Sequence, residues 1–265
     1  MKKILIAGFL ILLSGCAGPF GQFYYDQTGG VDITQVPSVL VSNDPPTLIR
    51  GSHPEKDGQK MLEDGYLIVG YSSFNAGNVN ENDAITQAKK VHAAVVLLYS
   101  RYTNTVSGAM PLTLPDTQTS NTSMFGSVQG YGGSATYSGS AYTTTYGTRT
   151  TYIPYSVTRY DYFATYWIKT KRPVFGVHSR DLNDELRQQI GSNKGALVIA
   201  VVKGSPAFRA DILKGDILRR IGTVDIYDVS SVQEALPQHA GEEVTVEILR
   251  NSTSIEKQVK LNQIP

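Results

Sequence analysis

Hydrophobic positions in the first half of the chain follow two different periods. The segments GYLIVGYSSF (65–74) and AAVVLLYSRYT (93–103) are short apolar runs rich in strand-forming residues. Between them, residues 78–93 contain Asn and Asp residues able to cap a helix, followed by four apolar residues at helical spacing. These four are Ala84, Ile85, Ala88 and Val91. The pattern predicts a β-α-β unit.

A long stretch without charge follows this unit. From Thr117 to Thr148 no residue is charged, and Ser, Thr, Gly and Tyr dominate. This composition argues against a compact core, although spaced Tyr and Thr residues favour strands. Residues 151–171 alternate like a strand and put four side chains on one face: Tyr162, Ala164, Tyr166 and Ile168. We expect a hairpin-like insertion at about 116–150 whose base returns to the sheet up to Lys169. A solvated loop and an aromatic surface for glycan or partner contacts are the alternatives.

The segment from Arg172 to Leu261 combines apolar alternation with helix and turn signals. Ser205 can cap a helix that has Pro206 in its first turn, and Gly215-Asp216 makes a tight turn before an apolar run. The segments GEEVTVEILR and SIEKQVKL predict a hairpin around Asn251-Ser252. The residues expected to face the core are Leu197, Ile199, Val201, Ile217, Ile221, Val244, Val246 and Ile248.

The order of these signals resembles a PDZ domain of the bacterial, HtrA-associated kind. The resemblance is carried by VFGV, then GALVIAVVKGSPA and ILKGDIL, an apolar helix and two final strands. It implies a β-barrel-like sandwich with two helices, in which an extended peptide or C-terminus adds as a strand to an exposed sheet edge. It also implies the peptide-binding residues, which are Val174, Phe175, Gly176, Val177, His178 and Ser179, with Val232 and Leu236 on the facing helix.

Each of these residues has an expected role. The loop that begins at Val174 would hold the peptide carboxylate through backbone amides, with Gly176 allowing a close approach. Phe175 and Val177 would wall an apolar pocket. The two apolar residues of the facing helix either line the groove or point into the core, since helical spacing alone does not assign the face. Pro237 is expected to end or kink this helix early.

The first residues indicate a compartment. Two lysines precede an apolar run from Ile4 to Leu13 that is too short to span a bilayer of roughly 30 Å. We interpret residues 1–15 as a signal peptide. The sequence Leu-Ser-Gly before Cys16 resembles the lipobox of bacterial lipoproteins, which implies lipid attachment at Cys16 and stable anchoring by more than one acyl chain. A lone buried thiol is the alternative for Cys16. Ala17 after the cysteine implies, by the same resemblance, sorting to the outer membrane.

Composition narrows the classes of function. The chain has 24 basic and 23 acidic residues, a net charge of +1, so nothing indicates nucleic acid as a partner. The single cysteine excludes an internal disulfide. Four scattered histidines lack the spacing of a metal site, and no phosphate-binding glycine motif is present. A trypsin-like protease would need a serine nucleophile in a G-N-S-G-like turn, which the sequence lacks. We therefore expect no catalytic residue, metal or cofactor.

Together these features predict an α+β chain of four parts. Residues 1–15 are the leader, 16–56 a tether, 57–171 a small α/β sheet domain with the Tyr/Gly/Ser/Thr-rich insertion, and 172–265 a PDZ domain. The predicted function is non-catalytic binding of a protein or peptide with an extended or C-terminal segment, by a lipoprotein of the cell envelope. The alternatives are a structural envelope component or adhesin that acts through the insertion, and an enzyme with an unrecognised site in the middle domain.

Overall fold

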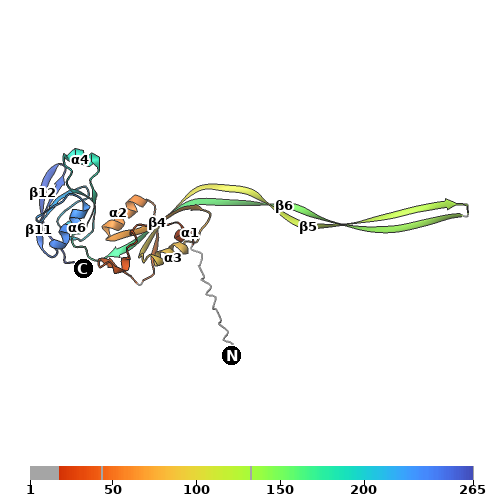
Figure 1. Cartoon of the computed structure of the whole chain (residues 1–265), viewed down its shortest axis with the longest axis horizontal. Coiled ribbons are helices and arrows are strands. Elements are labelled where there is room, and N and C mark those ends of the chain that lie inside the picture. Colours follow the sequence, from red (N-terminus) through yellow and green to blue (C-terminus); the bar gives the residue numbers. More distant parts are fainter. Residues whose placement is uncertain (1–17, 43, 132, 265) are drawn as a thin grey trace, which may run out of the picture. The chain divides into compact units, whose positions relative to one another are not determined.

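The computed structural model describes residues 18–42, 44–131 and 133–264. The chain is mixed α+β, as the sequence predicts. It divides into two compact units, of which the first joins Met1–Arg101 with Tyr160–Pro265 and the second is Tyr102–Arg159. The first unit contains two sheets with their helices, and the second is a two-stranded ribbon (Figure 1).

The first sheet has its strands in the order β1-β4-β6-β5-β3, with β2 beside β6. Strand β3 runs parallel to β5, whereas β1 and β2 pair antiparallel with β4 and β6. The predicted β-α-β unit is confirmed, and β6 lies between its two strands. The strands are β1 (Tyr24–Asp26), β2 (Val39–Leu40), β3 (Thr47–Arg50), β4 (Tyr66–Ala76), β5 (Val95–Gly130) and β6 (Gly133–Thr170).

Helices cover both faces of this sheet. On one face, Phe20 of α1 (Pro19–Gln22) and Ala84 of α3 (Asn82–Lys90) belong to the same buried cluster as the strands. On the other face, Met61 of α2 (Pro54–Glu63) belongs to a second cluster. A short 3-10 helix, η1 (Ile33–Gln35), precedes β2. The helix α2 has no counterpart in the sequence prediction.

The apolar run predicted as a buried strand lies between these two clusters. In β5 the side chains of Val96 and Leu98 join the cluster of α1 and α3, whereas Val95 and Leu97 join the cluster of α2. This arrangement explains why the run is continuously apolar, because both faces of the strand are covered. The four residues of β6 that were predicted to share a face do so, and all are buried: Tyr162, Ala164, Tyr166 and Ile168.

The prediction of a tether is wrong for the segment from Pro19 to Arg50. This segment supplies α1, η1 and strands β1 to β3. Phe20 is fully buried, and its carbonyl accepts a 2.6 Å hydrogen bond from the hydroxyl of Ser72. Ser72 Oγ lies 3.1 Å from the hydroxyl of Tyr166, whose pKa burial raises to about 12. Gly and Pro residues of the segment mark turns between short strands that complete the sheet.

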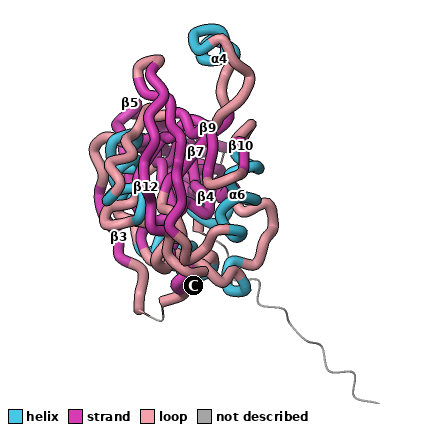
Figure 2. The backbone as a smooth tube through the Cα atoms, turned by 90° about the vertical axis from the view of Figure 1, so that its left-hand side faces the viewer, coloured by secondary structure: helices cyan, strands magenta, loops and turns pink. Residues whose placement is uncertain are grey.

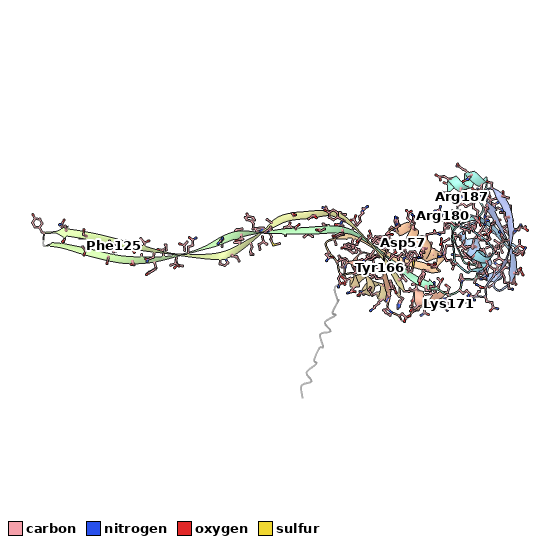
Figure 3. All side chains as sticks on the ribbon, turned by 180° about the vertical axis from the view of Figure 1, so that it is seen from behind. Asp57, Phe125, Tyr166, Lys171, Arg180 and Arg187 are labelled. Atoms are coloured by element: carbon pink, nitrogen blue, oxygen red, sulfur yellow. The ribbon has the colours of Figure 1, made fainter. Side chains whose placement is uncertain are left out.

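Strands β5 and β6 continue beyond the first sheet as the ribbon Tyr102–Arg159 (Figure 1). The hairpin prediction is confirmed, and the excursion is longer than the predicted 116–150. The solvated loop is wrong as an alternative, because β5 reaches Gly130 and β6 begins at Gly133. Phe125 lies near the far end of the ribbon and is 81% exposed (Figure 3).

The second sheet of the first unit has the order β12-β11-β9-β8-β7. The short strand β10 lies beside β9 (Figure 2). Its strands pair antiparallel, and it is an open sheet rather than a closed barrel. The strands are β7 (Val177–Asp181), β8 (Ala196–Val201), β9 (Ile217–Ile221), β10 (Val224–Asp225), β11 (Glu243–Arg250) and β12 (Thr253–Lys260). The helices are α4 (Asp184–Ile190), α5 (Pro206–Arg209) and α6 (Val229–Gln238).

The buried side chains of β8 are shifted by one position along the strand from the predicted core residues. The side chains of this strand that enter the core are Ala196, Val198 and Ala200. The predicted Leu197 and Ile199 are only half-buried, since successive side chains of a strand point to opposite faces. Val201 is also half-buried but packs against the core, as predicted. The remaining predicted core residues are confirmed: Ile217, Ile221, Val244, Val246 and Ile248.

Three local signals in this part of the chain are confirmed. Ser205 caps α5, where Pro206 occupies the first turn. Gly215 has a φ of +98° in the tight turn before β9, a conformation that glycine adopts without a steric cost. The dipeptide Asn251-Ser252 joins β11 to β12 with positive φ at both residues, as a two-residue hairpin turn of type I′ requires.

Candidate functional site

The loop that leads into β7 turns its carbonyl groups into the fold. The carbonyls of Val174, Phe175 and Gly176 each accept a backbone hydrogen bond of 2.8 to 3.0 Å. The donors are the amides of Asn262, Ala207 and Val202, in that order. Across the residues that the structure describes, the amides of Phe175 and Gly176 donate no hydrogen bond. The loop therefore holds two neighbouring amides that have no hydrogen-bond partner among the described residues.

Gly176 is required by the geometry of this loop. Its φ is +90°, which disfavours any residue with a side chain. A Cβ at this position would lie 2.2 Å from Cβ of Ser205. Ser205 itself caps α5 by accepting a 3.2 Å hydrogen bond from the amide of Phe208. The glycine thus lets the loop approach the start of α5.

Strand β7 is an edge strand, hydrogen-bonded to β8 on one side only. The pairing with β8 shifts register between His178 and Ser179, which marks a β-bulge. Helix α6 contacts β7 (Figure 2). The amide of Val229 donates a 2.9 Å hydrogen bond to Oδ1 of Asp181. An edge strand presents unpaired backbone groups, so the free side of β7 can accept a further strand.

Helix α6 contains the proline that was expected to end or kink it. Asp228 caps it by accepting a 2.8 Å hydrogen bond from the amide of Ser231. The helix continues through Pro237 to Gln238, so Pro237 does not end it, and the alternative of a kink stays a prediction. A proline in the last turn removes one amide donor but leaves the preceding turns intact.

The comparison with known families decides what this arrangement is. Residues 173–261 match the PDZ domain family. They form a PDZ domain. The HtrA-type protease AlgW with a decapeptide is similar at 20% identity and a TM-score of 0.31, over 38% of this chain and 37% of that chain. The HtrA3 PDZ domain bound to the phage-derived ligand FGRWV is similar at 23% identity and a TM-score of 0.30, over 33% of this chain and 83% of that chain. The chain therefore spans little more than a third of the protease. No curated protein matches it.

The PDZ domain places the predicted binding residues in two groups. Phe175 is 1% exposed and Val232 is 4% exposed, and both belong to the core cluster. The expectation that Phe175 walls an open pocket is therefore wrong. Val174, Val177 and Leu236 are half-buried against the same core and keep part of their side chains accessible. Val174 and Val177 flank the two loop amides in sequence, and Leu236 is the partly accessible apolar residue of α6.

His178 and Ser179 lie in β7, as predicted, and both are half-buried. The Nε2 atom of His178 is buried without a partner among the described residues. Burial lowers the pKa of His178 from its ordinary value of 6.5, because a charged ring would lose its hydration, and the nearby backbone of Leu62 in α2 opposes this shift. The ring of His178 thus lies close to α2.

A second set of contacts joins α2 to β8 and the turn after it. The side-chain amide of Gln59 donates to the carbonyl of Ile199 at 3.1 Å. The amide of Lys203 donates to the carbonyl of Glu63 at 2.8 Å, and its ammonium pairs with Asp64 at 2.8 Å. Helix α2 thus contacts the PDZ domain through the backbone of β8 and through Lys203 in the turn after it.

Sequence reasoning missed the strongest charged contact of the PDZ domain. The carboxylate of Asp216 is 1% exposed and accepts hydrogen bonds from Nε of Arg250 at 2.7 Å and from Nη2 at 2.8 Å. It also accepts the amide of Leu213 at 2.8 Å. The signal was present in the KGDIL segment, because an aspartate directly before a buried strand needs a partner.

Other site chemistries find no support in the described ranges. Among residues 18–42, 44–131 and 133–264, no group of three or more His, Cys, Asp or Glu side chains could hold a metal ion. Within the same ranges, no helix has the length and apolar character needed to cross a membrane. Cys16, the predicted lipid attachment site, lies outside the described residues and stays a prediction.

Proposed function

We propose that this protein binds an extended peptide with a free C-terminus, which adds as a strand to β7. The observation that carries the proposal is the free edge of β7 beside the two unused amides of Phe175 and Gly176 in the described part of the chain. Strand addition satisfies the backbone groups of the edge, and the amides can donate to the terminal carboxylate. PDZ domains use this mode of recognition, and residues 173–261 form such a domain.

The side chains beside the loop support an apolar residue at the end of the peptide. Val174 and Val177 flank the amides, and Leu236 comes from α6. All three are only half-buried, so a peptide side chain that covers them removes apolar surface from water. A charged side chain at the same peptide position would lose hydration without a partner.

We further propose that the binding is non-catalytic and takes place at the cell envelope. The loop before β7 offers backbone amides and apolar side chains, which bind but do not transfer protons. The lipobox-like sequence before Cys16 supports attachment to a membrane by a lipid, and Ala17 supports the outer membrane.

The experiment uses the full chain carrying Cys16→Ser, which prevents lipid attachment. A pool of ten-residue peptides ending in Val, Ile, Leu or Phe with a free carboxylate is titrated by calorimetry beside the same pool with amidated ends. We expect the free carboxylates to bind at least about 10-fold more tightly, since a hydrogen bond to a charged group contributes about 1.5–3 kcal/mol. Equal affinity of the two pools would refute carboxylate recognition.

A substitution in α6 tests the location of the site. Leu236→Glu puts a negative charge beside the expected carboxylate, so binding should fall at least 10-fold, about 1.4 kcal/mol. Gln233→Glu adds the same charge to the same helix at an exposed position and is the matched control. If both variants bind as the parent does, the peptide lies elsewhere.

A further inference from the structure

A cavity of about 340 Å³ lies between the end of β6 and the turn after β8. Residues 64–65, 169–173 and 202–205 line it, and all belong to the first unit. Pockets that hold small molecules commonly measure about 300–1,000 Å³, so the cavity has room for a small ligand. None of the described residues 174–181 lines it, which separates it from the free edge of β7.

A glycine leaves part of this cavity open. Gly65 has a φ of +78°, a conformation that favours glycine over residues with a side chain. A Cβ at this position would lie 3.4 Å from Cγ1 of Val202 and 3.9 Å from Nζ of Lys169, two residues that line the cavity. A side chain at position 65 would therefore reduce the space beside the ammonium group of Lys169.

Positive charge is concentrated around the cavity, which is lined by four cationic side chains and one carboxylate. The cations are Lys169, Lys171, Arg172 and Lys203, and the carboxylate is Asp64. Lys203 pairs with Asp64 at 2.8 Å. Among the described residues, no carboxylate lies within 4.0 Å of the other three cations. Because the whole chain has a net charge of only +1, three uncompensated cations at one cavity are a local feature.

One of these cations is held in place without a counter-charge. The ammonium of Lys169 donates a hydrogen bond to the backbone carbonyl of Asp64 and lies 4.2 Å from the centre of the Tyr66 ring. Both contacts attract a cation but leave its charge uncompensated. Lys171 (Figure 3) and Arg172 are exposed and follow β6, where the chain passes from the first sheet to the PDZ domain. Their long side chains can turn toward an anion in the cavity.

The charge around the cavity favours a phosphate group over a carboxylate as the ligand. A phosphate monoester carries a charge of about −1.5 to −2 near pH 7 and has three acceptor oxygens, whereas a carboxylate has a single charge and two oxygens. Three cations match the larger charge, and the guanidinium of Arg172 can donate two parallel hydrogen bonds to phosphate oxygens. We propose that this cavity binds a phosphate monoester group, carried either by a soluble molecule or by a lipid headgroup. Binding here does not require the β7 edge, so the peptide titration and the test below can fail separately.

The test titrates inorganic phosphate by calorimetry into the full chain carrying Cys16→Ser, at about 150 mM NaCl, where exposed charges are screened beyond about 8 Å. The cavity variant adds Lys171→Gln and Arg172→Gln, which remove two of the three uncompensated cations. The matched control adds Lys89→Gln and Lys90→Gln instead, which remove two exposed cations from the last turn of α3. We expect the parent and the control to bind phosphate equally and the cavity variant to bind it at least about 10-fold more weakly. Because all four substituted residues are exposed, the three proteins should melt within about 2 °C of each other.

Flotation with vesicles distinguishes the two sources of the phosphate group. The vesicles are phosphatidylcholine with either about 10% phosphatidic acid, whose headgroup is a phosphate monoester, or phosphatidylglycerol at equal total charge. Selective flotation of the parent and the control with phosphatidic acid, lost in the cavity variant, assigns the phosphate to a lipid. Phosphate binding without flotation assigns it to a soluble molecule, and either result supports the site. The proposal is overturned if the cavity variant binds phosphate and phosphatidic acid as the control does, or if none of the three proteins binds either.

Discussion

The ion pair between Asp216 and Arg250 is expected to dominate the stability of the PDZ domain. Removing Arg250 by the substitution Arg250→Met keeps a side chain of similar length but leaves the Asp216 carboxylate buried at 1% exposure. The carboxylate keeps only the amide of Leu213 as a partner among the described residues. The substitution would also disturb the hydrogen bonds of β8, because the backbone carbonyl of Asp216 accepts a 2.8 Å hydrogen bond from the amide of Val198.

The magnitude follows from burial and geometry. Breaking a buried ion pair by removing one partner destabilises a protein by about 3–5 kcal/mol. The Arg250 side chain is 23% exposed, so water can reach part of the space it leaves, and we expect about 3 kcal/mol. At about 2–4 °C per kcal/mol for a chain of this size, the melting temperature should fall by about 6–12 °C. Calorimetry of the full chain measures this shift.

Two further variants separate the ion pair from a general loss of packing. Lys257→Met removes a pair with Asp211, whose side chain is 68% exposed, and should change stability by less than about 1 kcal/mol. The double variant Asp216→Asn/Arg250→Met removes the charge together with its partner. Its loss of stability should be smaller, by at least about 1 kcal/mol, than the summed losses of Asp216→Asn and Arg250→Met, since the effects of groups in direct contact are not additive. If Arg250→Met melts within about 2 °C of the parent, the reasoning about the buried carboxylate is refuted.

Three other predictions test separate parts of the chain. The pKa of His178 lies below 6.5 in the folded state, so its contribution to stability should be constant above pH 6.5. As the pH drops through 6.5 the protein should lose stability, because the unfolded chain takes up the proton first. Urea unfolding at about pH 7.5 and 5.0 measures this loss of stability, and His178→Gln should make the loss smaller. Replacing residues 104–157 by a two-residue turn should leave the melting temperature of the first unit unchanged within about 2 °C, because the three core clusters contain no described residue from this range; a collapse of the fold would contradict this. Cys16→Ser should release the protein from membranes in cell fractionation, and retention after a high-salt wash would show that another segment anchors it.

The sequence predicted the PDZ domain because each of its local signals agreed with the tertiary structure. Ser205 lies before a proline at the start of a helix, and Asn251-Ser252 lies between two alternating runs. Such signals depend on residues close in sequence, so they can be interpreted without a fold. The strand face of Tyr166 was predicted for the same reason, since its neighbours alternate regularly.

The errors concern features that distant contacts decide. The segment from Pro19 to Arg50 has the composition of a tether, and only its pairing with β4, β5 and β6 orders it. In β8 both faces carry apolar residues, so periodicity could not tell which face enters the core. Phe175 was assigned to an open pocket, although the loop turns it into the core. The partner of Asp216 is 34 residues away, beyond the reach of any local pattern.

The buried position of Phe20 limits the distance over which a lipid-anchored form could work. Phe20 follows Cys16 by only four positions, and four residues of fully extended chain span at most about 14 Å. A lipid on Cys16, as we propose, would hold the first sheet close to the headgroups, within about two Debye lengths at physiological salt. Such a protein cannot search the space beyond the membrane on a flexible leash, so its peptide ligands would have to come from proteins that work at the bilayer surface or are delivered to it.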